Sequence, residues 1–138
     1  MRLWHKDLIP VLPRQQLIGQ WRECCLIAKN IAEKGEPNHI LVNKIMDYPI
    51  EHFYVYGLLV AQEMHDRGFH VDYTKFNRYF PVISRVNINI KDDLFKNWHN
   101  DRYLKQCYFN LQEKFDCDGI GLIEWEKIAE FIEKYEWR

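Results

Sequence analysis

The chain lacks the segments that place a protein in or across a membrane. No run of about 18 apolar residues occurs in its 138 residues, so no transmembrane helix is expected. The first residues include Arg2, Lys6 and Asp7 and lack the apolar core of a secretion signal. We therefore expect a cytoplasmic protein with no membrane partner.

Patterns that bind metals or form disulfides are also missing. The four cysteines contain no Cys-x-x-Cys pair, which indicates reduced thiols in a cytoplasmic core. The six histidines contain no His-Glu-x-x-His. Asp116-x-Asp118-Gly119 resembles a calcium loop, but Lys114 and Trp125 then occupy its first and twelfth positions, where acids are needed. A turn is the better interpretation, and we expect no metal and no cofactor.

The chain lacks the overall positive charge of many nucleic-acid-binding proteins, since its formal net charge is −1. The charge is uneven, however. Residues 1–23 contain four basic and two acidic residues, whereas residues 113–138 contain eight acidic and four basic ones. A local electropositive site is therefore compatible with a near-neutral protein. Aromatic residues, 15% of the chain, either fill the core or supply stacking surfaces for bases.

The longest helical pattern in the chain runs from about Pro13 to Lys34. Proline suits the first helical position, and Gly35 is the expected C-terminal stop. Apolar residues recur at helical spacing and predict one face turned to a core. They are Leu17, Trp21, Cys24, Ala28 and Ile31.

The opposite face of this helix carries Gln16, Gly19, Gln20 and Glu23. A glycine in the middle of a helix costs roughly 1 kcal/mol relative to alanine. Two interpretations remain open. Either this is a solvated face that tolerates a glycine, or Gly19 lets another molecule approach closely.

The remaining patterns predict an all-α fold: a single compact domain over residues 1–138, with two long helices and several shorter ones. Pro10 and Pro13 predict an extended N-terminal arm over the first long helix, pinned by Leu3, Leu8, Ile9 and Leu12. Residues 82–90 alternate like a strand and are interpreted as an extended surface segment. The other expected helices are His39–Met46 after a cap at Asn38, with Ile40, Leu41, Ile45 and Met46 inward, and Pro49–Arg67, with Phe53, Tyr56, Val60, Ala61 and Met64 inward. Three further helices are expected at Thr74–Tyr79 after a cap at Asp72, at Asp101–Lys114 and at Ile123–Tyr135.

Three segments near the N-terminus resemble the pyrimidine-dimer DNA glycosylase family. They are Met1–His5, Leu12–Leu17 and Gly19–Glu23, and a weaker similarity returns at Asp66–Phe69. The family includes the phage endonuclease V type of DNA glycosylase and abasic-site lyase, and the chain is more similar still to a bacterial branch. The resemblance implies a DNA repair enzyme.

An enzyme of this kind needs an amine that forms an imine with the sugar C1′, and a carboxylate beside it. The resemblance assigns the amine to Met1 and the carboxylate to Glu23. An α-amino group titrates near pH 8, so a useful fraction is neutral at physiological pH, unlike a lysine. Removal of an initiator methionine generally needs a small second residue. Arg2 therefore predicts that Met1 is retained.

The resemblance also implies binding to damaged double-stranded DNA. Arg2 and Arg22 are expected to hold phosphates or the region of the damaged base. Gly19 and Gln20 are expected to leave room for the sugar and to offer it a hydrogen bond. Arg14 and Gln16 complete the expected DNA-binding set.

The sequence departs from the phage-type enzymes at two positions. Those enzymes carry a histidine where this chain has Gln16, and an arginine where it has Leu26. We expect a monomeric glycosylase with abasic-site lyase activity on pyrimidine dimers. One alternative is a lyase that acts on abasic sites without excising dimers. Another is a non-enzymatic nucleic-acid or protein interaction module on the same fold.

Overall fold

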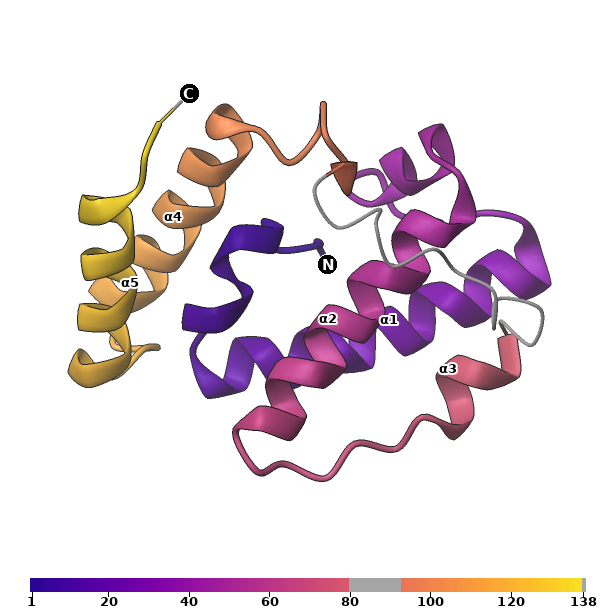
Figure 1. Ribbon diagram of the computed structural model, residues 1–138, viewed down its shortest axis with the longest axis horizontal. Coiled ribbons are helices and arrows are strands. Elements are labelled where there is room, and N and C mark those ends of the chain that lie inside the picture. Colours follow the sequence, from indigo (N-terminus) through magenta and orange to yellow (C-terminus); the bar gives the residue numbers. More distant parts are fainter. Residues whose placement is uncertain (80–92, 138) are drawn as a thin grey trace.

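The computed structural model describes residues 1–79 and 93–137, and every regular element within these ranges is helical (Figure 1). The all-α prediction is therefore confirmed, while the prediction for residues 82–90 lies outside the described residues. No helix in the described ranges has the length and apolarity needed to span a membrane. In chain order the elements are the 3-10 helix η1 (Lys6–Val11), α1 (Arg14–Lys34), the 3-10 helix η2 (Asn43–Asp47), α2 (Ile50–Asp66), α3 (Thr74–Tyr79), α4 (Asp101–Asp116) and α5 (Leu122–Lys134).

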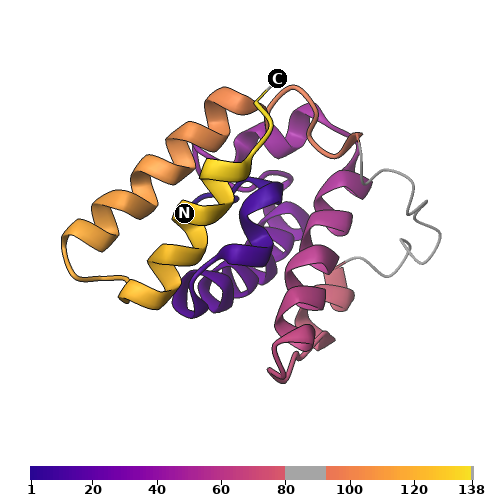
Figure 2. The same cartoon turned by 60° about the vertical axis from the view of Figure 1, so that its left-hand side comes forward.

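The N-terminal segment lies in the middle of the molecule. In Figures 1 and 2, residues 1–13 run between the hairpin of α4 and α5 on one side and the pair α1 and α2 on the other. Leu3, Leu8, Ile9 and Leu12 are all buried, as the sequence predicts. Burying a leucine side chain contributes about 1.5–3 kcal/mol, so this segment is part of the core.

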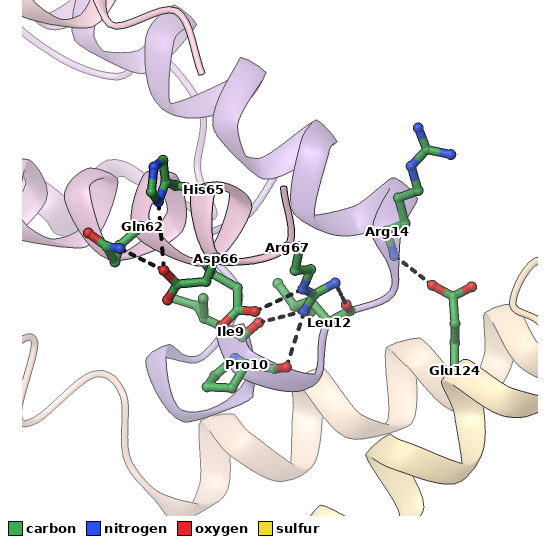
Figure 3. Close-up of polar contacts among 10 residues, drawn as sticks. Ile9, Pro10, Leu12, Arg14, Gln62, His65, Asp66, Arg67 and Glu124 are labelled. Atoms are coloured by element: carbon green, nitrogen blue, oxygen red, sulfur yellow. Dashed lines mark hydrogen bonds and ion pairs between the residues drawn. The ribbon is translucent and has the colours of Figure 1, made fainter. Parts of the chain in front are cut away.

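Helix α1 ends at Lys34 as its sequence predicts and begins one residue later than predicted, at Arg14, because Pro13 occupies the cap position. Gly35 follows it with φ 81°, a left-handed conformation that glycine adopts without strain. At the other end, Pro13 offers no side-chain cap. The Oε2 of Glu124 in α5 accepts from the Arg14 amide at 2.7 Å instead (Figure 3). This carboxylate satisfies one of the free amides at the positive end of the helix.

Helix α2 packs against α1 and, through a glycine, against α3. Gly57 faces the fully buried ring of Phe76, and a Cβ at position 57 would overlap that ring. The Asp72 Oδ1 accepts from the Thr74 amide at 2.9 Å, which confirms the predicted start of α3. The predicted inward face of α2 is also confirmed by its buried residues Phe53, Tyr56, Val60, Ala61 and Met64.

The prediction of a fully extended arm is wrong for residues 6–11, which form η1 despite Pro10. The fixed φ of proline is compatible with a 3-10 turn. In addition, a side chain distant in the sequence donates hydrogen bonds to the carbonyls at the end of the helix. The Arg67 guanidinium donates to the carbonyls of Ile9 at 3.3 Å, Pro10 at 3.1 Å and Leu12 at 2.8 Å (Figure 3). Residues 1–5 have no regular structure.

The prediction of a helix over His39–Met46 is also wrong. Only residues 43–47 are helical, as η2, and Asn38 adopts a left-handed φ of 63°. The His39 amide donates to Asn43 Oδ1 at 3.1 Å. This bond favours a turn over a helix. Of the four apolar residues predicted to face inward only Ile45 is buried, whereas Ile40, Leu41 and Met46 are exposed.

The C-terminal hairpin consists of α4 and α5, and both predicted helices are confirmed with small shifts of their ends. Asn100 caps α4, because its side chain accepts from the Tyr103 amide at 2.9 Å. Trp125 of α5 stacks on Tyr108 and Phe115 of α4. All four cysteines are free thiols, but the prediction that they lie in the core holds only for Cys24 and Cys107, because Cys25 is half-buried and Cys117 is exposed at the end of α4.

Candidate active site

The backbone of the N-terminal residues is held by side chains from the long helices. The Gln20 Nε2 of α1 donates to the Arg2 carbonyl at 2.9 Å, and its Oε1 accepts from the Trp4 amide at 2.8 Å. The Tyr56 hydroxyl of α2 donates to the Trp4 carbonyl at 2.5 Å. Buried backbone groups need such partners. Gln20 is only 1% exposed, so its amide is committed to this task.

The same segment is also held from the C-terminal side. The Tyr103 hydroxyl of α4 donates to the Leu3 carbonyl at 2.5 Å, and the Lys6 amide donates to His99 Nδ1 at 2.9 Å. The Lys6 Nζ donates to the Leu94 carbonyl at 2.7 Å. Residues 2–6 are therefore fixed by α1, α2, α4 and the turn before α4.

Glu23 lies beside the start of the chain. Its Oε2 accepts from the Arg2 amide at 3.5 Å, and Glu23, Arg2 and Met1 are each half-buried. Because consecutive Cα atoms are about 3.8 Å apart, the terminal amine belongs to the residue next to this contact. The fold therefore brings together Met1, Arg2, Gln20 and Glu23 from the predicted set.

The surface of α1 next to Glu23 is open. Among the described residues, no heavy atom beyond the two neighbouring residues and the helix's own backbone lies within 4 Å of a Cβ built on Gly19. Gln16, one turn earlier, is half-buried, and its Oε1 is itself buried and has no hydrogen-bond partner among the described residues. This stretch has both space and an unused acceptor on the side of the helix that carries Glu23.

The three predicted arginines lie in different surroundings. The Arg2 guanidinium lies 5.1 Å from the centre of the Trp4 ring, and Arg22 is exposed on α1 without an ion-pair partner among the described residues. The Arg14 guanidinium lies 5.3 Å from the centre of the Phe69 ring. Arg14 starts α1, nine residues before Glu23 and so about 14 Å away along the helix. The structure thus places Arg2 and Arg22 near Glu23 and Arg14 at a distance.

The comparison with protein families is decisive. Residues 1–77 match the family model described as pyrimidine dimer DNA glycosylase. The chain belongs to this family. It is therefore a DNA repair glycosylase, and its substrate is DNA. Neither the curated proteins nor the solved structures gave a match.

The family match covers only part of the candidate site in this glycosylase. It includes the arm, α1, α2 and all but the end of α3, whereas α4 and α5 lie beyond it. His99 and Tyr103, which hold the arm, therefore come from the unmatched part of the chain.

The sequence interpretation missed the residues that hold the arm. Tyr56 was expected only as a core residue, and neither His99 nor Tyr103 was singled out. Their partners lie 52, 93 and 100 residues away in the chain, respectively. Helical periodicity marks Tyr56 as inward-facing, but no local pattern indicates a bond between such distant residues.

Two buried histidines lie beside the arm of the glycosylase. The rings of His5 and His99 are 5.1 Å apart, and each Nδ1 accepts a backbone amide, from Asp7 and Lys6 respectively. The neutral rings therefore carry their proton on Nε2, where neither ring has a partner among the described residues. Burial lowers the pKa of both, more strongly for His99, where the charges of His5 and Lys6 add to the effect.

A separate cleft of about 950 Å³ lies between η1, α2, α5 and the turn before α4. Its lining includes Lys6, Glu63, Asp66, His99 and Arg102, so charges of both signs face it. Neither Met1 nor Glu23 lines this cleft, and it is not the candidate active site. Among the described residues, no group of three His, Cys, Asp or Glu side chains is arranged to hold a metal ion.

Proposed function

We propose that this glycosylase excises a damaged base through an imine between the Met1 α-amine and the sugar C1′, and then cleaves the strand by β-elimination. The observation that carries the proposal is the hydrogen bond from the Arg2 amide to Glu23 Oε2. It sets a carboxylate beside the terminal residue, in an arm whose backbone is fixed on several sides.

The chemistry needs a neutral amine and a nearby carboxylate. The Met1 amine attacks C1′, and the bond from C1′ to the base breaks, with its electron pair leaving on the base. One nitrogen proton passes to the released base, and a second passes to the ring oxygen as its bond to C1′ breaks, which opens the sugar ring and gives the imine. The Glu23 carboxylate stabilises the positive charge that develops on the sugar and moves these protons.

Strand cleavage follows from the same intermediate. The imine makes the proton on C2′ acidic, and its removal by Glu23 forms a double bond from C2′ to C3′ while the 3′ phosphate leaves. Water then hydrolyses the imine and frees Met1. No oxidant, metal or further cofactor is needed for these steps.

The proposed DNA contacts follow the exposed surface around Glu23. Arg2 and Arg22 bind phosphates next to the lesion. Gln16, whose Oε1 is buried and unpaired among the described residues, turns its side-chain amide outward to accept from a donor on DNA. Arg14 contacts the duplex further along α1. For Gln20 we propose a positioning role through the arm, because both of its amide atoms are already bonded there.

For the lesion we propose the cyclobutane pyrimidine dimer, in keeping with the family. A lyase limited to abasic sites is the second candidate. Leu26, at the position where phage-type enzymes carry an arginine, is 46% exposed and offers DNA no charge. We further propose that residues 1–138 act as one catalytic domain in a monomer, because α4 and α5 complete the packing around the arm.

Borohydride trapping tests the proposal. The protein, with Met1 verified by intact mass, is incubated with an abasic duplex and with an ultraviolet-irradiated duplex. We expect a covalent adduct on both. Glu23→Gln or an N-terminal extension should abolish it, whereas Glu33→Gln, an exposed acid on the same helix, should not.

The other outcomes are equally informative. An adduct on the abasic duplex alone would favour the lyase without dimer excision. No adduct on either duplex, from folded protein with a free Met1, would exclude the imine chemistry.

A further inference from the structure

Every carbonyl from Arg2 to His5 accepts a hydrogen bond. Gln20 binds the first carbonyl, and Tyr103, Tyr56 and the Leu8 amide bind those of Leu3, Trp4 and His5, respectively. The shortest of these contacts, at 2.5 Å, come from the two tyrosine hydroxyls. A segment bonded this densely has little freedom to move along or across its axis.

Tyr103 belongs to α4, and its hydroxyl donates to the carbonyl of Leu3, two residues after the residue that carries the terminal amine. Burial raises its pKa, so the phenol stays protonated and remains a donor to Leu3. The centre of its ring lies 5.8 Å from the centre of the Trp98 ring and 5.0 Å from the centre of the His99 ring. These contacts restrict the ring and so fix the direction of the hydroxyl.

His99 acts at the other end of the same segment. It is 5% exposed, and its Nδ1 accepts the Lys6 amide. Asn100, the next residue, caps α4 through the Tyr103 amide. The turn and the helix are therefore one rigid unit, which carries both contacts to the arm.

We propose that Tyr103 and His99 are positioning residues that set the terminal amine against Glu23, so that α4 completes an active site whose other parts come from residues 1–77. The inference rests on the proposed imine chemistry. Neither residue touches the DNA in this role. Both act through the arm, and their loss should slow the chemical step more than it weakens binding.

A conservative substitution isolates this role. Tyr103→Phe removes one oxygen atom and retains the ring, and His99→Ala removes the acceptor at Lys6 independently. Tyr108→Phe is the matched control, because Tyr108 is half-buried on the same helix and stacks on Trp125. Thermal melting verifies folding, and all assays run well below the lowest midpoint. One folded variant suffices for the test.

Two quantities are compared. The first is the single-turnover rate of borohydride trapping on an abasic duplex at saturating protein. The second is the Kd for a duplex with a tetrahydrofuran site, which cannot form an imine. We expect Tyr103→Phe and His99→Ala to lower the rate about tenfold to a hundredfold, as small misplacements of reacting groups do. The Kd should stay within about twofold, and Tyr108→Phe should change neither.

The contrary results separate two failures. Wild-type protein that traps DNA, with variants that trap at the same rate, would overturn the positioning role and leave the imine chemistry. A loss of rate matched by an equal loss of binding would overturn it too, because the residues would then be structural only. Wild-type protein that traps nothing would overturn the proposed function as well.

Discussion

At the scale of single residues, a substitution at Gly19 should have opposite effects on the stability of the fold and on the binding of DNA. Because a Cβ there meets nothing within 4 Å, Gly19→Ala should stabilise α1 by roughly 0.5–1 kcal/mol. If the sugar approaches this surface, the same methyl group should weaken binding of an abasic duplex several-fold. Urea unfolding and DNA titration measure the two effects. Stabilisation with unchanged binding would mean that the glycine is merely tolerated on a solvated face.

The two buried histidines predict a loss of stability in acid. Burial lowers the pKa of His5 and His99 in the folded state, so the unfolded chain binds more protons once the pH falls below about 6.5. Stability should therefore decline from pH 6.5 downward, by up to about 1.4 kcal/mol per pH unit for each histidine, until the folded-state pKa values are reached.

Urea unfolding at several pH values checks this decline. His99→Asn, whose side-chain oxygen can still accept the Lys6 amide, should reduce the slope. His65→Asn should leave it unchanged, because the His65 side chain is 75% exposed. If the pH dependence of stability in His99→Asn were unchanged, the loss of stability in acid could not be assigned to His99.

At the scale of helices, the contact of α2 with α3 depends on Gly57. A methyl group there overlaps the buried Phe76 ring. Gly57→Ala should therefore destabilise the protein by about 1–3 kcal/mol despite the better helix propensity of alanine. Gly19→Ala is the natural control, since the same substitution meets open space there. Equal effects of the two substitutions on the urea midpoint would show that α3 shifts to make room.

Helix η1 depends on Arg67 at the end of α2. Its guanidinium binds three backbone carbonyls (Figure 3). Its Nε also donates to the Glu63 carboxylate at 2.8 Å. Lysine cannot reproduce this fork, so Arg67→Lys should cost about 1–3 kcal/mol. Arg102→Lys, at an exposed arginine, should be nearly neutral in the same urea titration. A neutral Arg67→Lys would mean that η1 holds its shape unaided.

The sequence was sufficient where a helix carries its own signals. Periodicity together with Pro13 and Gly35 delimits α1 to within a residue. The prediction of a helix at 39–46 was wrong because the spacing of apolar residues does not reveal the left-handed turn at Asn38. The prediction for the arm was wrong for the opposite reason. Pro10 is a local signal against a helix, but bonds from the distant Arg67 stabilise the 3-10 helix η1.

The candidate site likewise contains residues that the sequence could predict and residues that it could not. The resemblance indicated Met1 and Glu23, and the fold brings the first residues of the chain to this carboxylate. The bonds that hold the arm could not be predicted, because Tyr56 and Tyr103 meet their partners only after the helices have packed. Such partners are properties of the tertiary structure and leave no periodic signal.

At the scale of the whole molecule, the formal net charge of −1 limits how DNA can be bound. If Arg2, Arg14 and Arg22 make the phosphate contacts, the logarithm of affinity should fall with the logarithm of salt with a slope of about −2.7. Arg22→Gln should reduce that slope by about one, and Lys114→Gln, at the far end of α4, should not. Fluorescence anisotropy across a salt series measures this. An unchanged slope for Arg22→Gln would place the phosphates elsewhere.

The bonds between the arm and α4 also order events in time. Leu3 is separated from Tyr103 by 100 residues, and a ribosome adds about 5–20 residues per second. The arm is thus synthesised several seconds before the helix that holds it. In a nascent chain the terminal amine would be an ordinary flexible amine, and a reactive nucleophile would exist only after nearly the whole domain had folded. A protein truncated before α4 would carry the same first 25 residues without a working amine.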